Sequence, residues 1–146
     1  MLSFVLLLAL SGFFLSGCGG RIFVEPLPGI SARSGLDAIK GTGFGLVEIV
    51  GEGIKPDGTL GKRGYWRYRF RGRQVTIWED GTIQSETHAA RVPLLGGWRL
   101  DSPQALSKLQ KRTGKQERQS SYRLVLRGCP ARWETERATV DALTGR

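Results

Sequence analysis

Few side chains in this sequence have the types and spacing that catalysis requires. His88, the one histidine, has no metal-ligand spacing around it. Two carboxylate pairs, Glu79 with Asp80 and Glu134 with Glu136, are predicted to lie on solvated surface, the first in a turn and the second on one strand face. We therefore predict that the protein is not an enzyme and that it holds no metal ion.

Positive charge is the more prominent chemical feature. The chain carries 22 Lys and Arg against 13 Asp and Glu, a formal net charge of +9, and such a field attracts nucleic acid, anionic lipid headgroups or acidic polymers. Between Gly64 and Arg71 aromatic and basic residues alternate with a period of two, which predicts a strand with aromatic residues on one face and arginines on the other. The candidate anion-binding residues are Lys62, Arg63, Arg67, Arg69, Arg71 and Arg73.

Two interpretations of this basic face stay open. It is either a solvated surface that keeps the protein soluble, or a binding face for lipopolysaccharide, extracellular DNA or anionic lipid. The strand also partly resembles the RNA-recognition strand motif, with three core positions mismatched. Its outward residues, which include Tyr65 and Arg67, suit phosphate better than base readout, so nucleic acid is the least favoured partner.

The first residues resemble a bacterial lipoprotein signal peptide. An uncharged apolar run from Met1 ends in Leu15-Ser16-Gly17-Cys18, which is similar to a lipobox, and the run is too short to favour a membrane span. The departure is an amino-terminal region without Lys or Arg. The resemblance implies that residues 1–17 are removed and that Cys18 receives a diacylglycerol thioether and an N-acyl chain such as palmitate. No other cofactor is predicted.

This lipid would hold the protein at the cell envelope, because a diacylglycerol supplies the two chains that stable attachment needs. Gly19 after the cysteine resembles outer-membrane sorting in Gram-negative lipoproteins. With Cys18 modified, Cys129 is the remaining cysteine. It is predicted to be a small buried hydrophobe in a turn, with intermolecular pairing as the alternative.

The rest of the chain is predicted to hold a tether over residues 18–33 and one domain over residues 34–146. Ser34 with Asp37 suggests the capping box of a short helix closed by Gly41. A second helix is predicted after Asp101 or Ser102, with Gly114 as its end. The predicted strands are 46–50, 64–71, 74–79, 82–87, 122–127, 131–136 and 138–142.

The carboxyl-terminal part resembles a PepSY-like domain. The resemblance rests on Trp98-Arg99-Leu100-Asp101-Ser102, on Trp133 and on Val140-Asp141-Ala142-Leu143-Thr144-Gly145. It implies an α+β fold with one or two helices on one face of an antiparallel sheet, and a non-catalytic binding or inhibitory role with an envelope protein or protease as partner. The repeated placement of a serine before a tryptophan further suggests two similar halves, residues 34–90 and 98–146.

Overall fold

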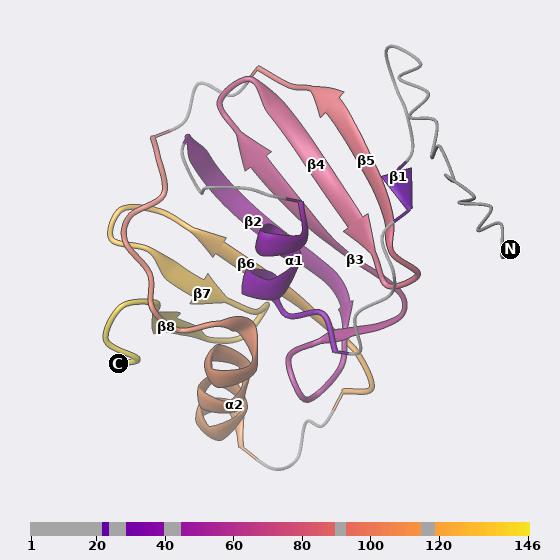
Figure 1. Cartoon of the computed structure of the whole chain (residues 1–146). Coiled ribbons are helices and arrows are strands. Elements are labelled where there is room, and N and C mark those ends of the chain that lie inside the picture. The colour runs from indigo at the N-terminus through magenta and orange to yellow at the C-terminus, as the bar shows by residue number, and fades with distance from the viewer. Residues whose placement is uncertain (1–21, 24–28, 40–44, 90–92, 115–118) are drawn as a thin grey trace, which may run out of the picture.

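A computed structural model describes residues 22–23, 29–39, 45–89, 93–114 and 119–146. The described residues form one antiparallel sheet with strand order β1-β5-β4-β3-β2-β6-β7-β8, together with two helices (Figure 1). The elements are β1 (Ile22–Phe23), α1 (Ala32–Ala38), β2 (Leu46–Ile54), β3 (Leu60–Phe70), β4 (Arg73–Trp78), β5 (Thr82–Thr87), α2 (Ser102–Thr113), β6 (Tyr122–Arg127), β7 (Arg132–Glu134) and β8 (Thr139–Asp141). The predicted α+β class with an antiparallel sheet is confirmed.

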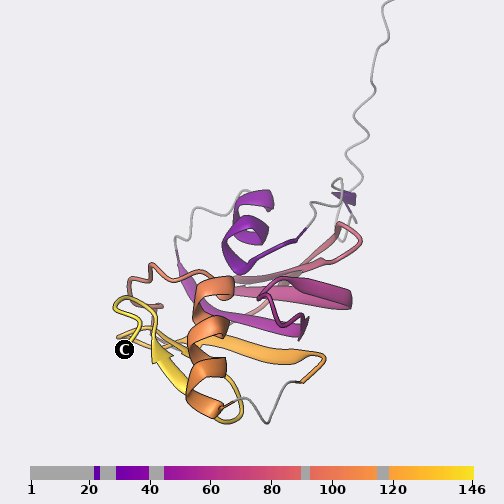
Figure 2. The ribbon, with the colours of Figure 1, turned by 90° about the horizontal axis from the view of Figure 1, so that it is seen from below.

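Both helices pack on the same face of the sheet. The buried residues of α1 and α2 form one hydrophobic cluster with one side-chain row of the strands, and Figure 2 shows the sheet edge-on with α1 above it. In β3 this row is Trp66, Tyr68 and Phe70, all buried, as the alternation predicted. In α2 it is Ala105, Leu106 and Leu109, the apolar stripe expected of an amphipathic helix. The opposite face of the sheet carries no described helix.

The amino-terminal ends of the two helices meet over the sheet. The Oγ of Ser102, a fully buried residue, accepts a hydrogen bond from the Ala32 N–H at 2.9 Å and donates one to the Gly58 carbonyl at 2.7 Å. Asp101, the N-cap of α2, accepts at Oδ1 from the N–H groups of Arg33 and Ser102. Because buried polar groups are costly when unpaired, these bonds fix the position of α1 relative to α2.

The domain begins earlier than the predicted Ser34. The N-cap of α1 is Ser31, and Ser34 occupies the third helical position of its capping box. Ile30 and Ala32 are buried in the core, so the segment from Ile30 to Arg33 belongs to the fold and not to a tether. Burial of these two apolar side chains starts the helix one turn before the position that the serine pattern indicated.

The first long hairpin also extends beyond its prediction. β2 continues to Ile54 and β3 starts at Leu60, with Glu52 opposite Tyr65 and Ile54 opposite Leu60. The predicted strands ended at residue 50 and began again at residue 64. Gly51 instead lies against the Trp66 ring, where a Cβ would clash, and Gly53 adopts φ 65° at the irregularity between the strands.

Residues 1–21, which include the predicted signal peptide and Cys18, lie outside the described residues. Among the residues that are described, none of the helices has both the length and the apolar character needed to cross a bilayer.

Candidate binding face

The sheet face opposite the helices carries the outward side chains of the basic strand. Tyr65, Arg67 and Arg69 of β3 are each half-buried and alternate with the buried row. Cross-strand pairing places Val50 of β2 and Thr76 of β4 on either side of Arg67. We call this surface the open face, and its central residues come from β2, β3, β4 and β6.

Ion pairs occupy most of the charged groups on the open face. Arg69 contacts Glu48 at 3.1 Å. Arg123 contacts Glu52 at 2.8 Å, and Arg127 contacts Glu134 at 2.7 Å. Each pair is partly solvated, so its net contribution to stability is about 1 kcal/mol or less. The main effect of these pairs is on anion binding. The three arginines already have carboxylate partners, so they attract an external anion less strongly.

Arg67 differs from these arginines. Its guanidinium lies 4.9 Å from the centroid of the Tyr65 ring, and its Nε is buried without a hydrogen-bond partner among the described residues. The Tyr65 ring in turn lies 6.2 Å from the Trp78 ring at an angle of 55°. Tyr65, Arg67 and Trp78 therefore form a half-buried patch of two aromatic rings and one cation that has no ion pair within the described part of the chain. We call it the Arg67 patch.

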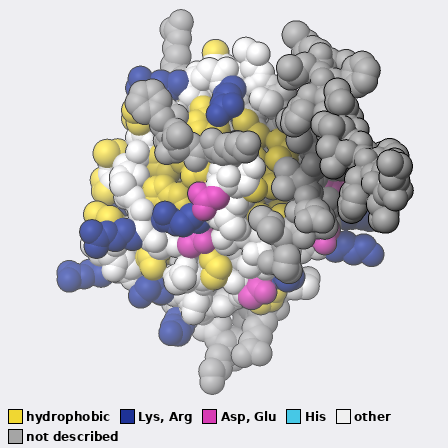
Figure 3. All heavy atoms as spheres, viewed as in Figure 1, with side chains coloured by type: hydrophobic (Ala, Val, Ile, Leu, Met, Phe, Trp, Pro, Cys, Tyr) yellow, Lys and Arg dark blue, Asp and Glu magenta, His cyan; other side chains and the backbone are white. Residues whose placement is uncertain are grey.

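The six basic residues proposed from the sequence do not form one cluster. Arg67 and Arg69 lie on the open face, but Lys62 and Arg63 are exposed at the start of β3, and Arg71 and Arg73 are exposed at its end. Arg63 and Arg71 are therefore separated by roughly 25 Å along the strand. In the view of the helix-bearing side (Figure 3), Lys and Arg side chains are likewise spread around the outline of the molecule.

Two hollows border the paired charges of the open face. The larger, of about 470 Å³, is lined by Val47, Glu48, Arg69, His88, Pro93, Arg127, Gly128 and Cys129. The smaller, of about 180 Å³, contains both Glu134 and Glu136 in its lining. Glu134 pairs with Arg127, whereas Glu136 lies beyond the end of β7 and is exposed.

The prediction that Cys129 is buried was wrong, because the residue is exposed. It lies in the turn after β6 and lines the larger of the two hollows instead of packing in the core.

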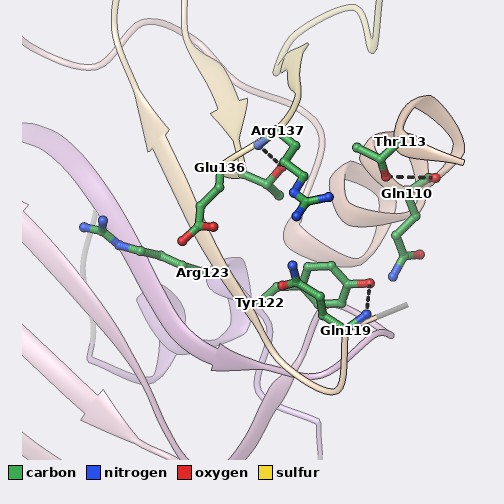
Figure 4. Close-up of a pocket in the computed structure, with 8 residues that line it drawn as sticks. Gln110, Thr113, Gln119, Tyr122, Arg123, Glu136 and Arg137 are labelled. Carbon is green, nitrogen blue, oxygen red and sulfur yellow. Dashed lines mark hydrogen bonds between the residues drawn. The ribbon is translucent and has the colours of Figure 1, made fainter. Parts of the chain in front are cut away.

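A third hollow lies where α2 ends beside β6 and the turn between β7 and β8. It is lined by the polar side chains of Gln110, Thr113, Gln119, Tyr122, Arg123, Thr135, Glu136 and Arg137 (Figure 4). The Tyr122 hydroxyl accepts a hydrogen bond from the Gln119 N–H at 3.3 Å. At about 50 Å³ the space suits water better than an organic ligand.

Three aspartates have a lowered pKa, and each one closes a turn. Hydrogen bonds from Thr59 lower the pKa of Asp57, those from Thr82 lower that of Asp80, and those from Thr144 and Leu143 lower that of Asp141. A carboxylate that accepts such bonds is held in its charged form. The Asp-Ala-Leu-Thr-Gly ending is thus a turn: Asp141 Oδ1 accepts from the Thr144 N–H at 2.7 Å, and Gly145 has φ 77°.

The structure brings the sequence-predicted groups into no catalytic arrangement among the described residues. His88 is half-buried in the large hollow, apart from the turn of Glu79 and Asp80 at the other end of β5. Within the described part of the chain, no three His, Cys, Asp or Glu side chains are grouped to hold a metal ion.

Sequence reasoning missed Trp78 as part of the candidate site. Its place in the predicted hairpin is the feature that could have identified it. Trp78 lies directly opposite Tyr65 in the register of β3 and β4, so both side chains point to the open face. Comparisons with protein-family models, with curated proteins and with solved structures found no match to this chain.

Proposed function

We propose that this protein is a lipid-anchored envelope lipoprotein whose PepSY-like domain binds a partner protein without catalysis, through the open face of its sheet. The observation that supports this most is the Arg67 patch. The Arg67 side chain has a buried Nε without an acceptor among the described residues, its guanidinium lies over the Tyr65 ring, and that ring lies against Trp78. Tyr, Trp and Arg are the residue types that contribute most to protein interfaces when they become fully desolvated.

The chemistry of the patch favours a carboxylate on the partner. A carboxylate could accept from the Arg67 guanidinium, and apolar groups beside it could pack on Tyr65 and Trp78. The neighbouring arginines are already paired with Glu48, Glu52 and Glu134. A carboxylate of the partner therefore binds most favourably at Arg67. A protease is one candidate, since related modules occur in protease propeptides.

Two similar halves are part of this proposal. Val50 of β2 and Val125 of β6 pair directly at the middle of the sheet. The tryptophans of β3 and β7 also make equivalent hydrogen bonds. Trp66 Nε1 donates to the carbonyl of Ile30 at 3.0 Å, and Trp133 Nε1 donates to that of Leu100 at 2.8 Å. Each carbonyl belongs to the residue before a helix N-cap. Superposition of residues 34–90 on 98–146 tests the duplication.

The binding proposal is tested by capture from detergent-solubilised membranes. The natural lipoprotein is compared with Arg67→Glu and with Lys111→Glu, an equal charge change on exposed α2. A specific partner should be retained by the natural protein and the Lys111 variant and lost with Arg67→Glu. Its purified form should then bind the Arg67 variant at least about tenfold more weakly, as expected for loss of a buried charge-assisted contact. Equal retention by all three proteins would refute the proposed face.

The anchor has its own test. Intact-mass analysis of the protein purified from membranes should show a chain that starts at Cys18 and carries diacylglycerol and an N-acyl chain. A mass that still includes Met1 without a glyceride would refute the proposed lipidation and envelope location.

A second proposal is an anionic-polymer binder. Lys62, Arg63, Arg71 and Arg73 support it because their side chains are exposed, and polyanion affinity should then fall steeply with ionic strength. A packed protein interface should change little over the same salt range. Unchanged polyanion binding after charge reversal at Lys62, Arg63, Arg71 and Arg73 would exclude this function.

A further inference from the structure

The end of the sheet at the β3–β4 turn combines exposed arginines with an apolar hollow. Arg71 and Arg73 flank Gly72 in this turn, and both are exposed. With Phe70, Gly45 and Leu94 they line a hollow of about 400 Å³. Leu94 is 41% exposed, and the Arg73 guanidinium lies 4.8 Å from the centroid of the Phe70 ring. We call Phe70, Arg71, Arg73 and Leu94 the hairpin end.

Charge is distributed differently at the opposite end of β3. Lys62 and Arg63 are exposed there too, but the acidic turn of Glu79 and Asp80 is tied to this end by a hydrogen bond from the Glu79 N–H to the Gly64 carbonyl at 3.0 Å. Near the hairpin end the described acidic groups include Glu86, which accepts from Gln84 and lies opposite Gln74, and Glu48, which is paired with Arg69. Arg71 and Arg73 make no ion pair with a described carboxylate. The hairpin end therefore attracts anions more strongly than the other end of the same strand.

The place of Cys18 in the sequence limits where a membrane can lie. Cys18 precedes Ile22 by four residues, which span at most about 14 Å. Ile22 pairs with Ile83 on β5, and Phe23 pairs with Thr82, so the upstream end of β1 is directed toward Thr87. Thr87 lies opposite Arg73, four residues or about 14 Å beyond Ile83 along the strand. A lipid on Cys18 can therefore reach the level of the hairpin end.

We propose that the hairpin end contacts the anionic lipid headgroups of the membrane that holds the acylated Cys18. Arg71 and Arg73 would face lipid phosphates, and Leu94 with the hollow beside Phe70 would take up the apolar boundary of the headgroup layer. Arginines close to an anionic membrane surface are attracted to it. This inference rests on the proposed lipid anchor, and it fixes the orientation of the domain, with the open face left available to a protein partner.

The experiment uses the lipidated protein reconstituted into vesicles of phosphatidylcholine, with or without phosphatidylglycerol. In a Cys129→Ser background, Leu94→Cys carries an environment-sensitive fluorophore, and Lys62→Cys carries the same fluorophore in a control protein. Quenching by a lipid-attached quencher measures how close each site comes to the bilayer. Two variants are compared in the Leu94→Cys protein: Arg71→Glu with Arg73→Glu, and the matched Lys62→Glu with Arg63→Glu. Far-UV circular dichroism checks that each variant is folded.

The inference predicts that the probe at position 94 is quenched more than the probe at 62, and that phosphatidylglycerol increases the difference. Charge reversal at Arg71 and Arg73 should lower the ratio of docked to undocked protein at least about tenfold, whereas reversal at Lys62 and Arg63 should leave it unchanged. Equal quenching at 94 and 62 in a protein shown by mass to be acylated would overturn the docking inference and leave the anchor intact. A protein without the glyceride would overturn both.

Discussion

The indole rings of Trp66 and Trp133 meet edge to face at the centre of the core, with ring centroids 6.3 Å apart and an interplanar angle of 67°. Both side chains are fully buried. Each one also donates its N–H to a carbonyl just before a helix, Trp66 to Ile30 and Trp133 to Leu100. The two tryptophans thus connect both helices to the sheet and to each other.

Replacement of either tryptophan by phenylalanine should lower the free energy of unfolding by about 2 kcal/mol, because the hydrogen bond from the indole N–H to a backbone carbonyl and part of the ring volume are lost. The double variant should lose less than the sum of the single losses, with a coupling energy of about 1 kcal/mol from the ring contact. Urea unfolding of the four proteins measures this cycle. Strictly additive losses would show that the two indoles act independently.

Ser102→Ala should cost about 2 kcal/mol of unfolding free energy. The buried hydroxyl bridges the Ala32 N–H and the Gly58 carbonyl, and its removal leaves both backbone groups unpaired away from water. Ser107→Ala is the control, since Ser107 is exposed on the same helix, and it should change stability by less than about 0.5 kcal/mol. Equal effects of the two substitutions would contradict the bridging role.

Tyr68 should make the fold sensitive to alkaline pH. Burial raises the pKa of Tyr68 well above its usual value, and its hydroxyl donates to the Ala32 carbonyl at 2.7 Å. An unfolded tyrosine loses its proton near pH 10, before the folded one does. The stabilisation is therefore complete below about pH 10 and is lost as the pH rises toward the folded pKa.

Denaturant unfolding at a series of pH values from about 8 to about 11 measures this loss. Tyr68→Phe should be less stable at neutral pH, because the hydrogen bond from the Tyr68 hydroxyl to the Ala32 carbonyl is lost, and its stability should fall less with rising pH. Tyr65→Phe is the control. It leaves the buried phenol of Tyr68 in place, so its stability should fall with pH as steeply as that of the natural protein. An unchanged slope in Tyr68→Phe would assign the alkaline sensitivity to other groups.

Strict alternation allowed the central strands to be predicted from the sequence. In β3 the apolar residues point to the face that packs in the core and the basic residues point to the solvated face. Trp66, Tyr68 and Phe70 are therefore buried as expected. The start of α2 was also predictable, because Asp101 is a favourable N-cap and Pro103 is tolerated only in the first turn of a helix.

Features that depend on tertiary contacts were not predictable in this way. Ser31 and Ser34 are both acceptable caps, and burial of Ile30 and Ala32 decides between them. The exposure of Cys129 depends on where the turn after β6 falls relative to the hollow. The sequence likewise could not distinguish Arg67 from Arg69, because the distinction arises when β2 brings Glu48 beside one of them.

That distinction gives the last prediction. Arg67→Met keeps the apolar stem that packs on the open face and removes a buried Nε that has no partner among the described residues, but it also removes the guanidinium contact with the Tyr65 ring. The two effects oppose each other, so stability should stay within about 0.5 kcal/mol of that of the natural protein. Arg69→Met should instead cost about 1 kcal/mol, because the Glu48 carboxylate, with its side chain 18% exposed, loses its ion pair. Urea unfolding compares the two. A half-buried arginine whose replacement costs the isolated domain almost no stability is expected to serve binding, so a loss with Arg67→Met as large as that with Arg69→Met would remove the main support for the open face as an interface.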